Sequence, residues 1–192
     1  RAAGRVDVNG SLNMTCNSCS ITGGDWPVGF HFVKGSVWIK GDDVTVGNLE
    51  LNGMSAGNED YGNVFGNRIR LFRVYAHGIK IPQFIGDTSD IGSGPEYLHN
   101  DVWQFWDNNG EVLRDLIIEE CVMTDFVQGI FLASETGILS RVSNWKILNN
   151  VLWGTTFVQN GNLQGSPSNG IFAGKYNVPG VAIMNNTIYR GG

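Results

Sequence analysis

One short pattern of apolar and polar positions recurs along the chain. Each copy has two apolar residues at alternate positions, a polar corner and two further apolar positions; the copies lie at 44–51, 69–76, 116–123, 145–152 and 181–188. Alternation is typical of strands with one buried face, and a polar corner lets the chain turn while its interior stays apolar. No stretch has the i, i+3, i+4 spacing of a helix. The pattern predicts an all-β fold, a single-stranded right-handed parallel β-helix (solenoid) of stacked coils.

If the copies stack in register, their equivalent residues form columns along the axis of the solenoid. We expect two inward columns, one of Val46, Leu71, Ile118, Ile147 and Ile183 and one of Leu51, Ala76, Met123, Leu152 and Ile188. Asn150 matches Asn186 in the next copy, and stacked Asn side chains can hydrogen-bond along the axis. At the corner, Arg73 and Glu120 become neighbours of opposite charge, which is consistent with the proposed register.

A second strand follows the pattern in three coils, at 101–105, 128–132 and 169–173. In these strands the inward positions are Trp103, Ile130 and Ile171, and the outward positions are Gln104, Phe131 and Phe172. The unequal spacing of the copies then indicates two loop insertions, at about 77–100 and 155–168, which leave the stack at the same corner. Residues 1–192 are interpreted as one domain with these two insertions.

Composition excludes several classes of function. The net charge is −5 and no run of Lys or Arg occurs, so a general nucleic-acid partner is not expected. No apolar stretch approaches 18 residues, so no membrane span is expected either. The chain opens without an initiator Met and closes partway through a predicted coil, and we therefore interpret it as part of a longer protein.

The three cysteines leave several interpretations open. Cys16 and Cys19 are separated by two residues, as in half of a zinc knuckle, but no second Cys/His pair follows at metal-binding spacing. The same spacing suits a disulfide that closes this short loop, and it also suits two unpaired thiols in a turn. Cys121 falls at an inward position and is predicted to be a small core residue.

Two sequence features resemble a known family. The Asn-bearing coils are similar to those of the pectin-lyase-like right-handed β-helix superfamily, and the segment His99-Asn-Asp101-Val-Trp-Gln104 resembles a His-x-Asp-x-x-Gln signature found in such β-helix repeat proteins. The resemblance covers about residues 37–190. It implies the fold and leaves the function open, because the superfamily includes polysaccharide lyases, glycoside hydrolases, phage tailspikes and non-catalytic adhesins. The Asp-Asp, Gly-His-Gly and Arg-x-Lys motifs of the hydrolase branch are absent, as is the Arg-x-Pro-x-x-Arg motif of the main pectate-lyase branch.

The strongest candidates for catalysis are His99, Asp101 and Gln104, at the end of the longer insertion and the start of a strand. His99 can act as a general acid or base near neutral pH. Asp101 can orient His99, bind a cation or act as an acid, and Gln104 can hold a sugar hydroxyl. In a purely structural interpretation, Asp101 caps a turn and His99 satisfies loop backbone.

Candidates for substrate binding lie on the outward column and in the first insertion. Exposed Phe131 and Phe172 rings would provide a platform for the apolar faces of sugars; equally, they could pack under an insertion or a second subunit. His77 and Lys80 open the insertion and would supply a base or neutralise a uronate carboxylate.

The same insertion carries the acidic candidates Asp87, Asp90 and Glu96. With Asp101 they would form a hydrolase carboxylate pair or bind Ca²⁺ through oxygen atoms. The pattern is also that of an acidic loop that is simply solvated, and no cofactor is otherwise indicated.

Two functions of different classes remain. The first is an extracellular or virion-borne domain that engages a polysaccharide in a groove beside the coils, and cleaves it as a lyase or hydrolase. The second is a non-catalytic structural β-helix, a tailspike shaft, adhesin or filament component, in which unpaired coil edges are capped or joined to another chain. The second would favour a homo-oligomer, as a trimer or by end-to-end stacking.

Overall fold

The computed structural model describes residues 7–25, 31–52, 62–78, 101–106, 112–124, 126, 128–133, 141–154, 157–159, 162–164, 169–173 and 178–189. This described part of the chain contains strands and turns and no α-helix, in agreement with the prediction of an all-β fold. The strands are β1 (Asp7–Asn9), β2 (Leu12–Thr15), β3 (Cys19–Thr22), β4 (His31–Lys34), β5 (Val37–Lys40), β6 (Val44–Asn52), β7 (Gly62–His77), β8 (Asp101–Trp106), β9 (Leu113–Glu119), β10 (Val122–Thr124), β11 (Gln128–Ala133), β12 (Val142–Leu148), β13 (Val151–Trp153), β14 (Phe157–Gln159), β15 (Asn162–Gln164), β16 (Asn169–Ala173), β17 (Ala182–Met184) and β18 (Thr187–Tyr189).

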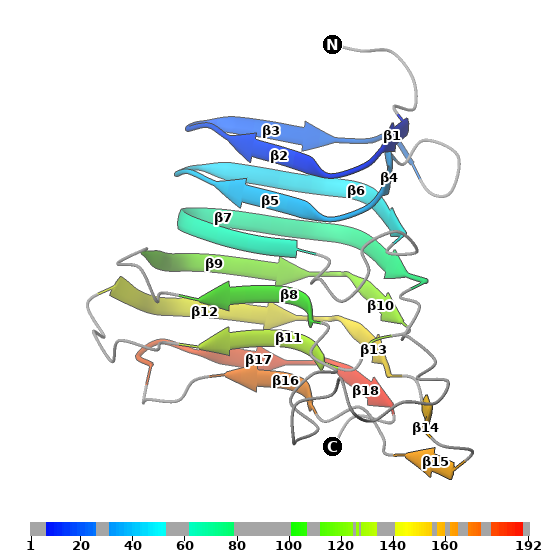
Figure 1. Ribbon diagram of the computed structural model, residues 1–192. Coiled ribbons are helices and arrows are strands. Elements are labelled where there is room, and N and C mark those ends of the chain that lie inside the picture. The colour runs from blue at the N-terminus through cyan, green and yellow to red at the C-terminus, as the bar shows by residue number, and fades with distance from the viewer. Residues whose placement is uncertain are drawn as a thin grey trace, which may run out of the picture.

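Sixteen of these strands form one sheet of parallel strands that curls like a half-barrel. Figure 1 shows successive passes of the chain stacked in order, from the blue strands near the N-terminus to the red strands near the C-terminus. Strands β14 and β15 pair with each other in antiparallel fashion and form a separate two-stranded sheet. They belong to the segment that the sequence identified as the second insertion.

Within the curled sheet the parallel strands pair in three series, which we call ladders. Each strand of a ladder is one rung, so paired residues on neighbouring strands lie on adjacent rungs. The first ladder contains β2, β5, the start of β7, β8, β11 and β16. The second contains β3, the start of β6, the middle of β7, β9, β12 and β17. The third contains β1, β4, the ends of β6 and β7, β10, β13 and β18. Strand β7 therefore passes through all three ladders in one coil.

The polar corners of the sequence pattern are single residues in the left-handed backbone conformation. Between the second and third ladders the corner is Asn48, Arg73, Glu120, Asn149 or Asn185, with φ between 49° and 56°. A residue at positive φ bends the strand and interrupts its alternation, so the residue two positions before the corner and the residue directly after it both face inward, as Leu71 and Val74 do around Arg73. Asn is the commonest residue here because its short polar side chain tolerates this conformation.

The inward column of the second ladder has the predicted register. Val46 pairs with Leu71, Leu71 with Ile118, Ile118 with Ile147 and Ile147 with Ile183. The first four of these side chains are fully buried, which confirms their inward orientation. Ile183 is 44% exposed, so the prediction of a fully buried column is wrong at its last member. The reason is that β17 has a neighbouring strand on one side only among the described strands.

The first ladder also has the predicted inward residues, with Trp103 paired to Ile130 and Ile130 to Ile171. Trp103 is fully buried, and the rung above it is Gly62. A Cβ atom built on Gly62 would lie 2.2 Å from the Trp103 ring. The large side chain thus depends on a glycine in the adjacent coil, which the sequence pattern did not predict.

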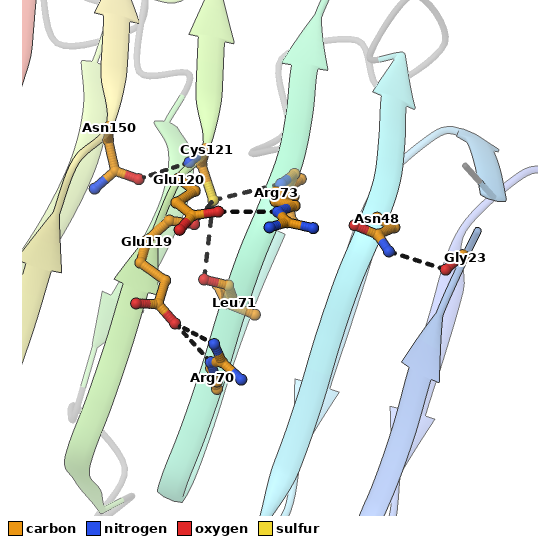
Figure 2. Close-up of polar contacts among 10 residues, drawn as sticks. Gly23, Asn48, Arg70, Leu71, Arg73, Glu119, Glu120, Cys121 and Asn150 are labelled. Atoms are coloured by element: carbon orange, nitrogen blue, oxygen red, sulfur yellow. Dashed lines mark hydrogen bonds and ion pairs between the residues drawn. The ribbon is translucent and has the colours of Figure 1, made fainter. Parts of the chain in front are cut away.

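A line of buried polar contacts follows the inner side of the corner (Figure 2). Asn150 Nδ2 donates to Asn186 Oδ1 at 2.9 Å, as predicted, and also to Ile118 O at 3.0 Å. Asn150 Oδ1 accepts the Cys121 N–H at 3.0 Å. Cys121 continues the line, because its Sγ accepts the Val74 N–H at 3.5 Å. Burial raises the pKa of this thiol to about 12, so it stays protonated.

Ion pairs join exposed corner residues of adjacent coils. Arg73 Nε donates to Glu120 Oε2 at 2.9 Å, which confirms the predicted pair, and Figure 2 shows this contact. Both side chains are about half exposed, so the pair contributes at most about 1 kcal/mol. At the corner between the first and second ladders, the Arg68 guanidinium hydrogen-bonds Asp43 and lowers the pKa of that carboxyl.

The stack begins earlier in the chain than the sequence pattern indicated. Strands β1 to β4 form ladder positions within residues 7–22 and 31–34, before the first copy of the pattern at 44–51 and before residue 37, where the resemblance begins. Between β2 and β3, Cys16 and Cys19 form a disulfide, which decides among the three interpretations left open for these cysteines.

Candidate functional site

Several of the predicted site residues lie outside the described residues: His99, Lys80, Asp87, Asp90 and Glu96. The roles proposed for them as catalytic, substrate-binding or Ca²⁺-binding groups stay predictions. Of the proposed catalytic group, Asp101 is the first residue of β8, where its backbone pairs with that of Gln128.

The outward column of the first ladder has the predicted register, but its described side chains are less exposed than predicted. Gln104 pairs with Phe131, and Phe131 with Phe172, so the three residues lie on successive rungs. Gln104 alternates with the buried Trp103, yet its side chain is itself only 7% exposed, and Phe131 is partly buried. The side chain of Phe172 lies outside the described part of the structure. At Gln104 this column therefore offers no open platform for a sugar.

His77, like Phe131, is a predicted site residue with a partly exposed side chain. It is the last residue of β7, on the outward side of the third ladder, because the neighbouring Ala76 faces the core. Its Nε2 lies 3.0 Å from Glu50 Oε1, and its ring stacks on Tyr75 with 4.4 Å between centroids and 18° between planes. The Glu50 and His77 side chains are about one-fifth exposed.

The outward positions below this cluster continue across three more strands. We call the resulting surface the aromatic face and define it by the outward side chains of the third ladder from β7 to β18: Tyr75, His77, Val122, Thr124, Val151, Trp153, Thr187 and Tyr189. Trp153 and Tyr189 are 54% and 51% exposed, and their rings meet edge to face with centroids 5.2 Å apart. Val122 and Val151 beside them are also exposed.

The register explains how this face arises. Each coil turns at its left-handed corner, and the next residues alternate between a core position and an outward position. Leu152 is fully buried, so Val151 and Trp153 on either side of it must face outward. The same alternation places Thr187 and Tyr189 around Ile188, one rung further along the axis.

The aromatic face lies at the corner from which the two insertions leave. His77 ends β7 and Trp153 ends β13, and the segments that follow them lead to β8 and β16 of the first ladder. Between them, Thr124 ends β10, and only three residues separate it from β11. The aromatic face therefore lies at the strand ends from which the long connections begin.

The chemistry available on this face is suited to binding. Exposed rings provide apolar platforms, while the Glu50–His77 pair and the Thr124 hydroxyl provide polar groups. A glycosidase needs two carboxyl groups about 5–9.5 Å apart on either side of the scissile bond; beside the described part of this face, Glu50 hydrogen-bonds His77 and Glu120 is paired with Arg73. No cluster of three or more His, Cys, Asp or Glu residues able to hold a metal ion occurs among the described residues.

Sequence reasoning singled out His77 on this face and missed Trp153 and Tyr189. A signal was present, because both aromatic residues directly follow the last inward position of the repeated pattern, as His77 follows Ala76. The repeated pattern is defined by its inward residues, and this outward position lies one residue beyond its end.

The chain matches no protein-family model, no curated protein and no solved structure. Fold and site together define an all-β protein with parallel strands in a curled sheet and an exposed aromatic face, and the comparisons assign it to no family. Within the described residues, no helix is long and apolar enough to cross a membrane.

Proposed function

We propose that this chain is a right-handed parallel β-helix domain of the pectin-lyase-like kind, and that it binds a polysaccharide along the aromatic face. Three features support the proposed β-helix: coils that repeat the same three ladders, left-handed corner residues in register, and the Asn150–Asn186 contact inside the corner. An extracellular or virion-borne location accords with such a ligand.

The observation that carries the binding proposal is the exposure of Trp153 and Tyr189 on adjacent rungs. Large aromatic side chains are usually buried, and exposed aromatic surface commonly marks a binding site. The faces of these rings match the apolar faces of sugar rings, whereas the hydroxyl groups at the edges of a sugar need polar partners. His77 and Glu50 provide such partners at the other end of the same face.

The dimensions of the face suit a linear ligand that runs along the axis of the stack. Adjacent rungs are about 4.8 Å apart. His77 and Tyr189 are separated by three rung intervals, so the column between them is about 14 Å long. A short oligosaccharide segment can therefore contact the polar end and the aromatic end at once.

Cleavage of the polysaccharide is a separate proposal, which rests on His99, Asp101 and Gln104. His99 precedes β8 in the sequence, Asp101 is the first residue of β8 and Gln104 lies within it; β8 is the strand reached by the connection that leaves after His77. A ligand on the aromatic face would pass the corner at which this connection begins. Lyase or hydrolase activity is tested by incubation with polysaccharides, with ultraviolet absorbance for unsaturated uronates and an assay for reducing ends.

The binding proposal is tested with alanine variants and a panel of polysaccharides in affinity gel electrophoresis and titration calorimetry. Trp153→Ala and Tyr189→Ala should each weaken binding roughly 2- to 10-fold, because each removes one aromatic platform. Trp38→Ala is the matched control: Trp38 is 48% exposed but lies on β5 of the first ladder, away from the face. Unchanged affinity in both face variants, or an equal loss in the control, would overturn the proposal.

The non-catalytic structural β-helix is the second candidate, and an edge of the ladders among the described strands bears on it. The inward-pointing residues Ile183 and Ile188 are 44% and 43% exposed there, and the backbones of β17 and β18 each pair with one described strand. Such an edge can extend its ladders onto another coil. Light scattering across a range of protein concentrations tests this candidate, since end-to-end association would raise the measured mass.

A further inference from the structure

The aromatic face has little charge. From β7 to β18 its outward side chains are Tyr, His, Val, Thr and Trp residues, without a Lys or an Arg. The carboxylate of Glu50 lies one rung above Tyr75 and hydrogen-bonds His77, and that of Glu120, two residues before Val122, is paired with Arg73. The nearest basic residue in the same column is Lys34, which lies on β4, two rungs above His77.

Three arginines near the face are already bonded to carboxylates elsewhere. Each pairs across adjacent coils on the second ladder or at one of its corners, and the pairs are Arg68 with Asp43, Arg70 with Glu119, and Arg73 with Glu120. To bind an anionic ligand, these guanidinium groups would have to leave carboxylate partners. The positive charge of these three arginines is therefore committed to holding adjacent coils together, and Lys146, in the same column as Arg70, lies on the second ladder and not on the aromatic face.

In sequence, the two connections that begin next to the face carry no excess of positive charge. In the sequence, residues 155–168 contain no charged side chain. Residues 78–100 contain one basic residue, Lys80, against the three acidic residues Asp87, Asp90 and Glu96. The whole chain has a net charge of −5, so a polyanion approaching the face would meet a neutral to acidic surrounding.

From this distribution of charge we infer that the polysaccharide is an uncharged one, built of sugars without carboxylate or sulfate groups. The inference rests on the proposed function and specifies its ligand. A polyuronate carries a charge on every sugar, and along the described face those charges would meet the Glu50 carboxylate and no Lys or Arg among the outward side chains, which opposes binding. A neutral glycan needs only ring stacking and hydrogen bonds, and the face supplies both.

The experiment titrates the protein with neutral polysaccharides (a β-glucan, a mannan, a galactan and dextran) and with acidic ones (polygalacturonate, alginate and hyaluronan). Each titration is run at about 0.05 M and about 0.5 M NaCl, where charge screening differs strongly. We expect binding to at least one neutral glycan, with less than about a twofold change in affinity between the two salt concentrations. Binding of acidic glycans alone, weakened by salt, would overturn the inference.

Two charge variants sharpen the result. Glu50→Gln removes the negative charge and keeps a hydrogen-bonding group beside His77; Lys34→Gln removes the nearest positive charge in the column. Lys34→Gln should leave the affinity for a neutral glycan within about threefold, which corresponds to less than one hydrogen bond; Glu50→Gln, at a residue of the binding face, is used only to compare the binding of acidic glycans. Glu50→Gln should ease the repulsion of a polyanion; if the unaltered protein already binds a polyanion and Lys34→Gln abolishes that binding, the ligand is charged and the inference fails.

The failure of this inference can be told apart from the failure of the proposed function. If a polyanion binds and Trp153→Ala weakens that binding, the aromatic face is a glycan site and its ligand class was assigned incorrectly. If no polysaccharide binds, or binding does not depend on Trp153 and Tyr189, the proposed function fails and this inference fails with it.

Discussion

The sizes of Gly62 and Trp103 are coupled across two coils, and this coupling gives a quantitative test of the packing. The Gly62→Ala Cβ would lie 2.2 Å from the Trp103 ring, too close for two carbon atoms. Gly62 is not among the residues with positive φ, so its backbone accepts alanine. Relief of glycine entropy would favour alanine by about 0.4–1 kcal/mol, whereas overpacking costs about 1–3 kcal/mol. We expect a net loss of about 1–2 kcal/mol.

Trp103→Ala should cost about 3–5 kcal/mol, because the ring is fully buried and its removal leaves a cavity. The loss should fall near the lower end of this range, because Trp103 Nε1 is buried without a hydrogen-bond partner among the described residues and its removal relieves that penalty. In the Trp103→Ala background, Gly62→Ala should cost almost nothing, since its methyl group enters the vacated space. The expected coupling energy is about 1–2 kcal/mol.

Equilibrium urea denaturation, followed by far-ultraviolet circular dichroism, measures all four free energies of unfolding. Trp103→Phe is the control variant, because it retains a large ring and removes the unpaired N–H; it should cost less than Trp103→Ala. The reasoning is refuted if Trp103→Ala costs under about 1 kcal/mol, since the ring would then be outside the core and the strand phase shifted by one residue. Simple additivity of the two substitutions would refute the contact with Gly62.

Three further predictions concern the corners. Cys121→Asn should raise the free energy of unfolding by about 0.5–1.5 kcal/mol by extending the polar line, whereas Asn150→Ala should lower it by about 1–3 kcal/mol; urea denaturation tests both. The Cys121 thiol, with its pKa raised to about 12 by burial, should react with a thiol reagent at about pH 8 only after unfolding, and reaction in the folded protein would contradict this. Arg68 lowers the pKa of Asp43, so this pair stabilises the fold above about pH 4 and less as the pH falls further; Arg68→Gln should flatten that part of the pH–stability curve.

The interior of the stack could be predicted from sequence because burial selects residue type. Val46, Leu71, Ile118 and Ile147 share a column, and each must be apolar since nothing but other side chains surrounds it. The early coils were missed because too few alternating positions mark them. Their strands are three or four residues long and are interrupted by residues such as Gly10 and Gly35, so alternation is too brief to stand out.

Contacts that depend on the size of a neighbour in another coil could not be predicted. Gly62 leaves space for Trp103, and Gly47 leaves space for the Phe72 ring, where an added Cβ would lie 2.1 Å from a ring carbon. In each pair the two residues are far apart in sequence, and the glycine alone is indistinguishable from a turn residue. Only the register of the ladders brings the partners together.

The exposure of outward side chains is harder still to predict. Alternation indicates that a side chain points away from the core, but it does not indicate what covers that side chain. Gln104 and Trp153 are both outward residues next to a fully buried one, yet their exposures are 7% and 54%. The difference depends on how other parts of the chain lie over each ladder, which periodicity does not encode. On a stack whose core is fixed by packing, the residues free to serve function are those outward columns that stay uncovered. By that criterion the third ladder, with Trp153 and Tyr189 exposed beside the Glu50–His77 pair, is the surface on which a ligand should be sought first.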